Sequence, residues 1–162
     1  MIRRMLETDL EAVARLERLY FSLPWSKKQL EESLESPGYL FLAAEEQGEV
    51  IGYAGLLKIL DEGNITNIVV EEAYRGRGIG RRLTEALLAE GRQSGLHAFT
   101  LEVRVSNAAA IHVYESLGFV REGVRRHFYE HPEEDALIMW KREGESPFRV
   151  LEDRPVISYS SD

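Results

Sequence analysis

The chain has 162 residues and a mass of 18.5 kDa, which suits a single domain with a core of its own. Hydrophobic residues make up 44% of the chain and charged residues 30%, so the composition excludes a disordered or collagen-like protein. The net charge of −8 argues against bulk binding to nucleic acid, and no apolar run approaches the roughly 20 residues of a membrane span.

Two helices are predicted after a short first strand. The first helix carries Leu10, Val13, Leu16 and Tyr20 at helical spacing. Capping-box spacings open both helices, Thr8 with Glu11 for the first and Ser26 with Gln29 for the second. The connection between them, Phe21–Trp25, is apolar, although loops are normally polar. It therefore either packs onto the core or lines a site.

The rest of the chain alternates between the two periodicities. Strand patterns cover residues 39–45, 49–57, 64–70, 98–103, 120–129 and 136–141, and helical patterns cover 79–95 and 107–117. A Gln47-Gly48 turn joins the first two of these strands as a hairpin. This order predicts an α/β fold with a mixed sheet. The pattern dissolves after Arg142, so we expect one domain over residues 1–142 and a poorly ordered tail over 143–162.

Cysteine is absent from the chain, which excludes disulfides, cysteine-ligated zinc and a thiol nucleophile. The four histidines show no spacing typical of metal ligands, and we assign no metal site. Four arginines, Arg75, Arg77, Arg81 and Arg82, fall within eight residues that contain no acid. We expect a cytoplasmic protein, a monomer or weak homo-oligomer, with no nucleic-acid or membrane partner.

The strongest local signal is the run Tyr74-Arg75-Gly76-Arg77-Gly78-Ile79-Gly80-Arg81-Arg82, between a predicted strand and a predicted helix. Glycines let a backbone approach a ligand closely, a helix start presents free N–H groups, and arginines supply positive charge. The combination favours pyrophosphate binding over a purely structural turn. It is not a Walker P-loop, because no Gly-Lys-Ser/Thr follows, and its glycine spacing does not match the dinucleotide-binding fingerprint.

The segment Arg75–Gly80 resembles the Arg/Gln-x-x-Gly-x-Gly/Ala turn with which the GNAT superfamily of N-acetyltransferases grips the pyrophosphate of coenzyme A. The order of predicted elements is similar to that fold up to about Arg142. Four further segments, Leu101–Ile111, Tyr114–Phe119, Pro24–Ser26 and Glu134–Ala136, resemble the RimI family, which acetylates the N-terminal alanine of a ribosomal protein. The resemblance implies a GNAT fold, with a mixed central sheet of about seven strands and four helices, and acetyl-CoA as co-substrate.

The resemblance also implies catalytic residues. Glu102 matches the glutamate that acts as general base, and Tyr114 matches the tyrosine that protonates the departing sulfur. From the residues alone, Glu102 is also compatible with a structural ion pair to Arg104 or a neighbour, and Tyr114 with a core position. Because the chain has no cysteine, direct attack of the amine on the thioester is the natural mechanism.

The cofactor is expected to lie along one strand and the glycine-rich turn. The expected contacts are Ile68, Val69, Val70, Arg75, Gly76, Arg77, Gly78, Ile79, Gly80, Arg81, Asn107 and Tyr114. Residues 68–70 would meet the pantetheine arm through backbone groups, and free N–H groups where the Glu102 strand splays away could hold the thioester oxygen. Asn107 either caps its helix or, as the resemblance implies, contacts the cofactor.

The acceptor is expected to be the N-terminus of a protein, the alanine of a small-subunit ribosomal protein. An α-amine with a pKa near 8 is roughly 20% neutral at pH 7.4, whereas a lysine is only about 0.1% neutral. Apolar residues on two connections, Phe21, Pro24 and Trp25 on one and Phe128 and Tyr129 on the other, are the expected walls of the groove. The alternatives are a broader N-terminal, lysine or small-amine acetyltransferase, or a non-catalytic acetyl-CoA-binding module.

Overall fold

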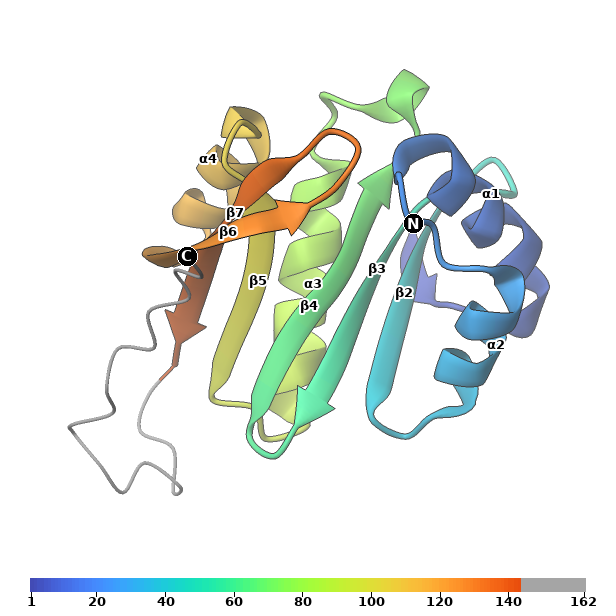
Figure 1. The fold of residues 1–162 in the computed structure, drawn as a ribbon. Coiled ribbons are helices and arrows are strands. Elements are labelled where there is room, and N and C mark those ends of the chain that lie inside the picture. The colour runs from blue at the N-terminus through green and yellow to red at the C-terminus, as the bar shows by residue number, and fades with distance from the viewer. Residues whose placement is uncertain (144–162) are drawn as a thin grey trace.

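Seven strands form one mixed sheet, with helices on both faces, in the computed structural model, which describes residues 1–143 (Figure 1). The strands are β1 Ile2–Arg4, β2 Tyr39–Glu46, β3 Glu49–Ile59, β4 Glu62–Val70, β5 Ala98–Arg104, β6 Val120–Tyr129 and β7 Glu134–Arg142. The helices are α1 Leu10–Tyr20, α2 Lys27–Glu35, α3 Ile79–Gln93 and α4 Ala108–Ser116, with short 3-10 turns at Glu7–Asp9 and Glu72–Tyr74. The predicted fold class is confirmed.

The strand order is β1-β2-β3-β4-β5-β7-β6, and β4 with β5 is the parallel pair of this sheet. The first four strands are antiparallel neighbours. Short turns join β2 to β3 and β3 to β4, whereas α1 and α2 lie between β1 and β2. The parallel step from β4 to β5 requires a crossover, which α3 supplies. At the other end, β7 lies between β5 and β6, so β6 is an edge strand.

The predicted helix starts have different outcomes. The Ser26 capping box is confirmed, because the Ser26 hydroxyl accepts from the Gln29 N–H at 3.1 Å and the Gln29 side chain accepts in return at 2.9 Å. The Thr8 capping box is wrong, since Thr8 lies inside the 3-10 turn. The Asp9 carboxylate takes that place by accepting from the Leu6 N–H at 2.7 Å.

Buried apolar side chains form two clusters, one on each face of the sheet. The cluster under α3 contains Leu83 and Leu87 together with alternate β5 residues, among them Leu101 and Val103. Since successive strand residues point to opposite faces, Glu102 lies on the other face, where α1 and α2 pack.

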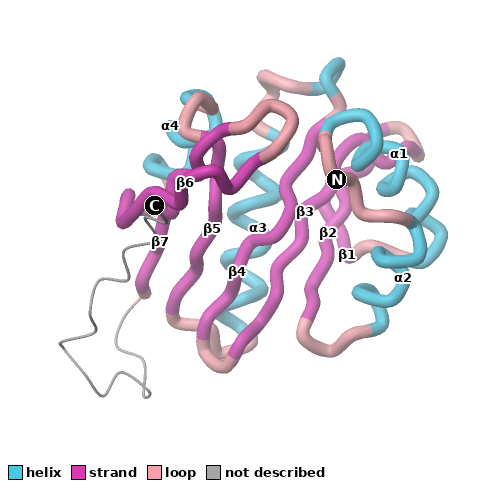
Figure 2. Tube along the Cα trace, in the orientation of Figure 1, coloured by secondary structure: helices cyan, strands magenta, loops and turns pink. Residues whose placement is uncertain are grey.

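Strands β4 and β5 pair only at their beginning, over Glu62–Asn64 and Ala98–Thr100. Beyond that point the two strands diverge, as Figures 1 and 2 show. The register of β4 against β3 also shifts between Ile65 and Asn67, which leaves Thr66 as an extra residue in the strand. The expected splay beside Glu102 is therefore present.

The predicted tail over residues 143–162 lies outside the described residues except for Glu143. The backbone N–H of Glu143 donates to the His97 carbonyl at 2.7 Å, and its carboxylate pairs with Arg92. This residue therefore still belongs to the folded domain. Within residues 1–143, no helix is long and apolar enough to cross a membrane.

Candidate active site

The basic segment identified in the sequence connects β4 to α3. Gly76 and Gly78 adopt positive φ angles of 81° and 77°, and a Cβ atom at either position would meet nothing within 4 Å. Gly78 is the N-cap of α3, and no side chain caps this helix. The N–H groups of its first turn are therefore free to bind an anion, and the positive φ angles are the reason for glycine here.

Aromatic rings hold two of the arginines of this turn. The Arg75 Nε donates to the Val70 carbonyl at 2.9 Å, and its guanidinium lies 4.6 Å from the centre of the Tyr20 ring. The Arg77 guanidinium lies 5.1 Å from the centre of the Tyr74 ring. Both arginines are exposed and thus combine positive charge at the turn with a restricted orientation.

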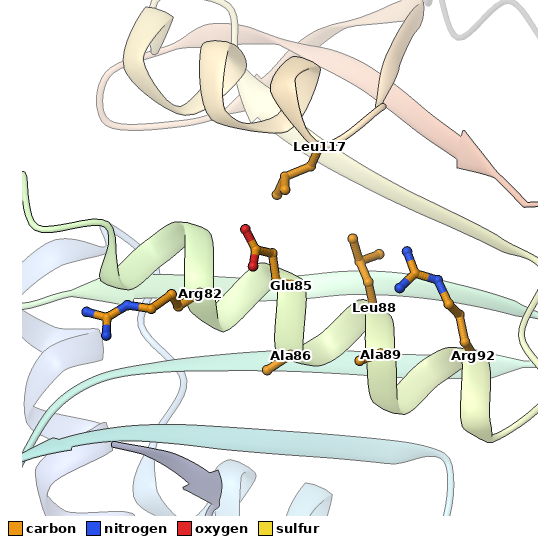
Figure 3. Close-up of a pocket in the computed structure, with 7 residues that line it drawn as sticks. All are labelled: Arg82, Glu85, Ala86, Leu88, Ala89, Arg92 and Leu117. Carbon is orange, nitrogen blue, oxygen red and sulfur yellow. The ribbon is translucent and has the colours of Figure 1, made fainter.

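Arg81 points instead towards α4. Its Nε donates to the Glu85 carboxylate at 3.0 Å and a terminal nitrogen donates to the Ser116 hydroxyl at 2.6 Å. Farther along the same helix a groove of about 530 Å³ extends towards Leu117 (Figure 3); it is lined by Arg82, Glu85, Ala86, Leu88, Ala89, Arg92 and Leu117. None of the predicted site residues lines this groove.

The predicted pantetheine contacts lie on the diverging part of β4. Ile68, Val69 and Val70 pair with β3 on one side, and no β5 residue pairs with them on the other. Backbone groups on this edge are therefore available to a ligand that binds as a strand does. Asn107 caps α4, since its side-chain oxygen accepts from the Ala110 N–H at 3.2 Å. The cap alternative is thus confirmed, and a cofactor contact stays a prediction.

The two predicted catalytic residues, Glu102 and Tyr114, each lie close enough to Tyr129 to shift the pKa of its hydroxyl. Burial is the main cause that raises the pKa of the Tyr129 hydroxyl to about 12; the nearby Glu102 carboxylate and Tyr114 hydroxyl act in the same direction, whereas Arg104 opposes them. Burial also raises the pKa of Tyr114 to about 12, so this hydroxyl is protonated at neutral pH. One carboxylate and two protonated phenol groups therefore occupy this part of the structure.

The ion pair between Glu102 and Arg104 that the sequence left open is not formed. The Arg104 guanidinium donates to the Pro132 carbonyl at 2.9 Å, pairs with Glu134 at 3.3 Å and lies 4.4 Å from the centre of the Tyr129 ring. Within residues 1–143, no cation lies within 4.0 Å of the Glu102 carboxylate. Glu102 is half-buried and can accept a proton, while Arg104 holds the β6–β7 connection in place.

The two expected walls of the acceptor groove touch each other. The Ser22 hydroxyl, in the connection between α1 and α2, donates to the Glu130 carbonyl in the connection between β6 and β7 at 3.0 Å. Phe21 is 36% exposed and Phe128 is 38% exposed, so each wall carries an aromatic side chain at the surface. Pro24 is exposed as well.

Trp25 lies on the core side of its loop. Its ring packs edge-on against Tyr39 at 6.0 Å and against Phe41 at 6.3 Å between centroids. Its backbone N–H donates to the Glu17 carboxylate at 3.0 Å. Of the two roles that the apolar loop allowed, Trp25 therefore anchors the loop to the core, and the loop presents Phe21 and Pro24 outwards.

Sequence reasoning missed Glu17, which is 1% exposed. Burial raises the pKa of its carboxyl group, and its Oε2 atom has no partner among the described residues. The Asn67 side-chain nitrogen approaches the other oxygen at 3.5 Å. A signal was present, because Glu17 follows Val13 by four residues and so lies on the apolar face of its helix.

No cluster of three or more metal-ligating side chains exists within residues 1–143.

A family model and several known proteins are similar to this chain. The Acetyltransferase (GNAT) family model matches residues 10–119. The ribosomal protein bS18-alanine N-acetyltransferase of Escherichia coli is 40% identical over 134 residues, which cover 82% of this chain and 90% of that protein. The N-alpha-acetyltransferase RimI of Mycobacterium tuberculosis is 35% identical over 150 residues, which cover 89% of this chain and 93% of that protein.

The structures agree with the sequences. The crystal structure of the ribosomal-protein-S18-alanine N-acetyltransferase from Escherichia coli matches with a TM-score of 0.82 and 35% identity, over 93% of this chain and 98% of that chain. The resemblance to the GNAT superfamily and to the RimI family is therefore confirmed. With the family model, the relatives and the fold in agreement, the chain belongs to the GNAT family of acetyltransferases, whose acetyl donor is acetyl-CoA.

Proposed function

We propose that this enzyme acetylates the N-terminal α-amine of a protein, and that its acceptor is the N-terminal alanine of a small-subunit ribosomal protein in the cytoplasm. The observation that carries the proposal is the 40% identity to an enzyme named for that reaction, over 90% of that enzyme. The contact between the two walls of the acceptor groove supports it. The hydrogen bond from Ser22 to Glu130 closes the groove on one side, which obstructs an internal segment whose backbone must enter and leave. An N-terminus only has to enter.

The proposed cofactor position follows the backbone. The pyrophosphate of acetyl-CoA lies against the turn at residues 76–81 and the N-terminus of α3, where the N–H groups are free and Arg77 is near. The pantetheine arm runs along Ile68–Val70, and this brings the thioester to the opening between β4 and β5. In this proposal Asn107, the N-cap of α4, and Tyr114, on the same helix, contact the cofactor near that opening.

In the proposed mechanism the acceptor nitrogen attacks the thioester carbon, its proton passes to Glu102, and the carbon–sulfur bond breaks. Proton transfer to one carboxylate, directly or through a water molecule, is less unfavourable from an α-amine with a pKa near 8 than from a lysine with a pKa near 10.4. Tyr114 donates to the departing sulfur. Its raised pKa of about 12 makes it a weaker acid than a thiol with a pKa near 8.5, so hydrogen bonding to the developing thiolate is its main contribution.

Mass spectrometry of peptides incubated with acetyl-CoA tests this function. A peptide that begins with alanine and contains an internal lysine should gain one acetyl group, at its N-terminus. The same peptide with a blocked N-terminus should gain none. Acetylation of the lysine in the blocked peptide would contradict the proposal and favour a lysine or small-amine acetyltransferase. Binding of acetyl-CoA with no acetylation of any amine would favour a non-catalytic binding module.

A further inference from the structure

Tyr20, the last residue of α1, contacts Glu72 and Arg75 in the segment between β4 and α3, here called the cofactor turn. This is unexpected because α1 leads into a wall of the acceptor groove. The Tyr20 hydroxyl oxygen accepts a hydrogen bond from the Glu72 backbone N–H at 2.9 Å. Its ring lies 4.6 Å from the Arg75 guanidinium carbon. An ion pair between Arg15 and Glu71 at 3.1 Å joins the same helix to the same segment. The end of α1 and the start of the cofactor turn are therefore fastened together.

Arg75 is fixed from two directions. Its Nε donates to the Val70 carbonyl at 2.9 Å, and the Tyr20 ring covers one face of the guanidinium. Among residues 1–143, no acceptor is bonded to its two terminal nitrogens. Their N–H groups remain available, and paired N–H groups of a planar guanidinium match the geometry of a phosphate.

The fixed orientation has a consequence for affinity. An exposed arginine loses the rotamer freedom of a long side chain when a phosphate binds it, and this loss weakens binding. Arg75 is already restricted by Tyr20 and Val70, so it loses less when a ligand arrives. The hydrogen bond to Glu72 adds a second restriction, because it holds the segment from which the turn begins.

We propose that Tyr20 is a positioning residue for coenzyme A, which orients Arg75 towards the pyrophosphate and holds the turn at Glu72. The proposal rests on the placement of the pyrophosphate at residues 76–81. Tyr20 directly precedes Phe21 of the acceptor wall, but the proposal assigns Tyr20 to cofactor binding and not to peptide binding. A change at Tyr20 should therefore alter the affinity for coenzyme A and leave the affinity for the acceptor peptide unchanged.

Calorimetry with coenzyme A and with pantetheine, which lacks the pyrophosphate, tests this assignment. Tyr20→Leu removes the ring and the hydroxyl, and Tyr20→Phe removes the hydroxyl alone. We expect the Kd of coenzyme A to rise about fivefold in Tyr20→Leu and about twofold in Tyr20→Phe, the scale of one cation–π contact and one hydrogen bond. Pantetheine should bind all variants equally. Leu19→Ala, which alters an exposed neighbour on α1, is the control.

A double-mutant cycle distinguishes positioning from general support of the fold. In an Arg75→Ala background, Tyr20→Leu should add no more than about twofold, because the residue acts mainly through Arg75. The KM for an acceptor peptide should stay within about twofold of its original value in all variants. Equal losses for coenzyme A and pantetheine, an undiminished effect in the Arg75→Ala background, a rise confined to the peptide KM, or no change would each overturn the proposal. Failure of the proposed acceptor would leave the calorimetry unaffected, because it contains no peptide.

Discussion

The two sides of the candidate active site are built differently. The proposed pyrophosphate site on the cofactor side is a single stretch, Arg75–Arg81, in which glycines with positive φ lead to a helix N-terminus without a side-chain cap. The acceptor side combines elements that are far apart in the chain, and a hydrogen bond from Ser22 to Glu130 closes it. A site made by the backbone of one turn leaves a motif in the sequence. A site made by side chains from distant elements leaves only scattered apolar residues.

The largest effect is expected where the two sides meet. Glu102→Gln should lower kcat about 10²- to 10⁴-fold, because the amide cannot accept the proton of the acceptor amine. The loss should be greatest at acidic to neutral pH, where the amine is protonated. The Kd of acetyl-CoA should stay unchanged, since the cofactor contacts are intact. Kinetics from pH 6 to 9 provide the check, and an unaltered pH–rate profile would exclude Glu102 as the base.

A second variant addresses the cofactor side alone. Arg77→Ala should raise the Kd of coenzyme A about tenfold, the scale of one charge-assisted hydrogen bond to a phosphate. Pantetheine should bind as before. Calorimetry with both ligands makes the comparison, with Arg18→Ala as an exposed-arginine control on α1. Equal weakening of both ligands would contradict the placement of the pyrophosphate at this turn.

A third variant opens the acceptor side. Ser22→Ala removes the hydrogen bond to the Glu130 carbonyl and should raise the peptide KM about threefold, in keeping with the net value of one hydrogen bond. The KM for acetyl-CoA should not change. Ser94→Ala, at the far end of α3, is a matched control. If both KM values rose together, the two sides would not be separable as described.

The smallest effect concerns the buried acid behind the acceptor loop. Burial raises the pKa of Glu17 in the folded protein, so the folded state binds a proton more tightly than the unfolded chain. The free energy of unfolding should therefore fall as the pH rises from the unfolded pKa to the folded pKa. Glu17→Gln removes this loss and can still accept from the Trp25 N–H. Its stability relative to the original protein should be higher at pH 8 than at pH 5.

Urea unfolding at the two pH values measures this difference. Glu11→Gln is the control, because the ion pair with Lys27 lowers the pKa of Glu11, so that Glu11 titrates mainly below pH 5 in the folded and the unfolded chain. Its stability relative to the original protein should therefore change little between pH 5 and pH 8. Parallel behaviour of the two variants would show that the burial of Glu17 is not the cause.

The features that the sequence predicts correctly depend on contacts between neighbouring residues, and those that it misses depend on contacts between residues distant in sequence. The Ser26 cap, the Gln47-Gly48 hairpin and the turn before α3 depend on neighbouring residues, and the sequence predicts all three. The Thr8 cap fails because Asp9 is engaged by Arg3, at 2.7 Å, in a network that extends to β2. The contacts of Ser22 with Glu130, of Glu17 with Asn67 and of Tyr20 with Glu72 likewise join residues that are distant in sequence, and only the folded chain reveals them.

The most direct test of an acceptor groove for N-termini uses ligands that occupy the cofactor side and the acceptor side of the site together. Coenzyme A is linked through an acetyl bridge to the α-nitrogen of an alanine-initiated peptide, and in a second conjugate to the ε-nitrogen of an internal lysine. An acceptor groove that admits a chain end and stops a continuing backbone predicts that the α-linked conjugate binds at least about tenfold more tightly, a difference of about 1.4 kcal/mol. Equal affinities, or a preference for the lysine conjugate, would contradict the account.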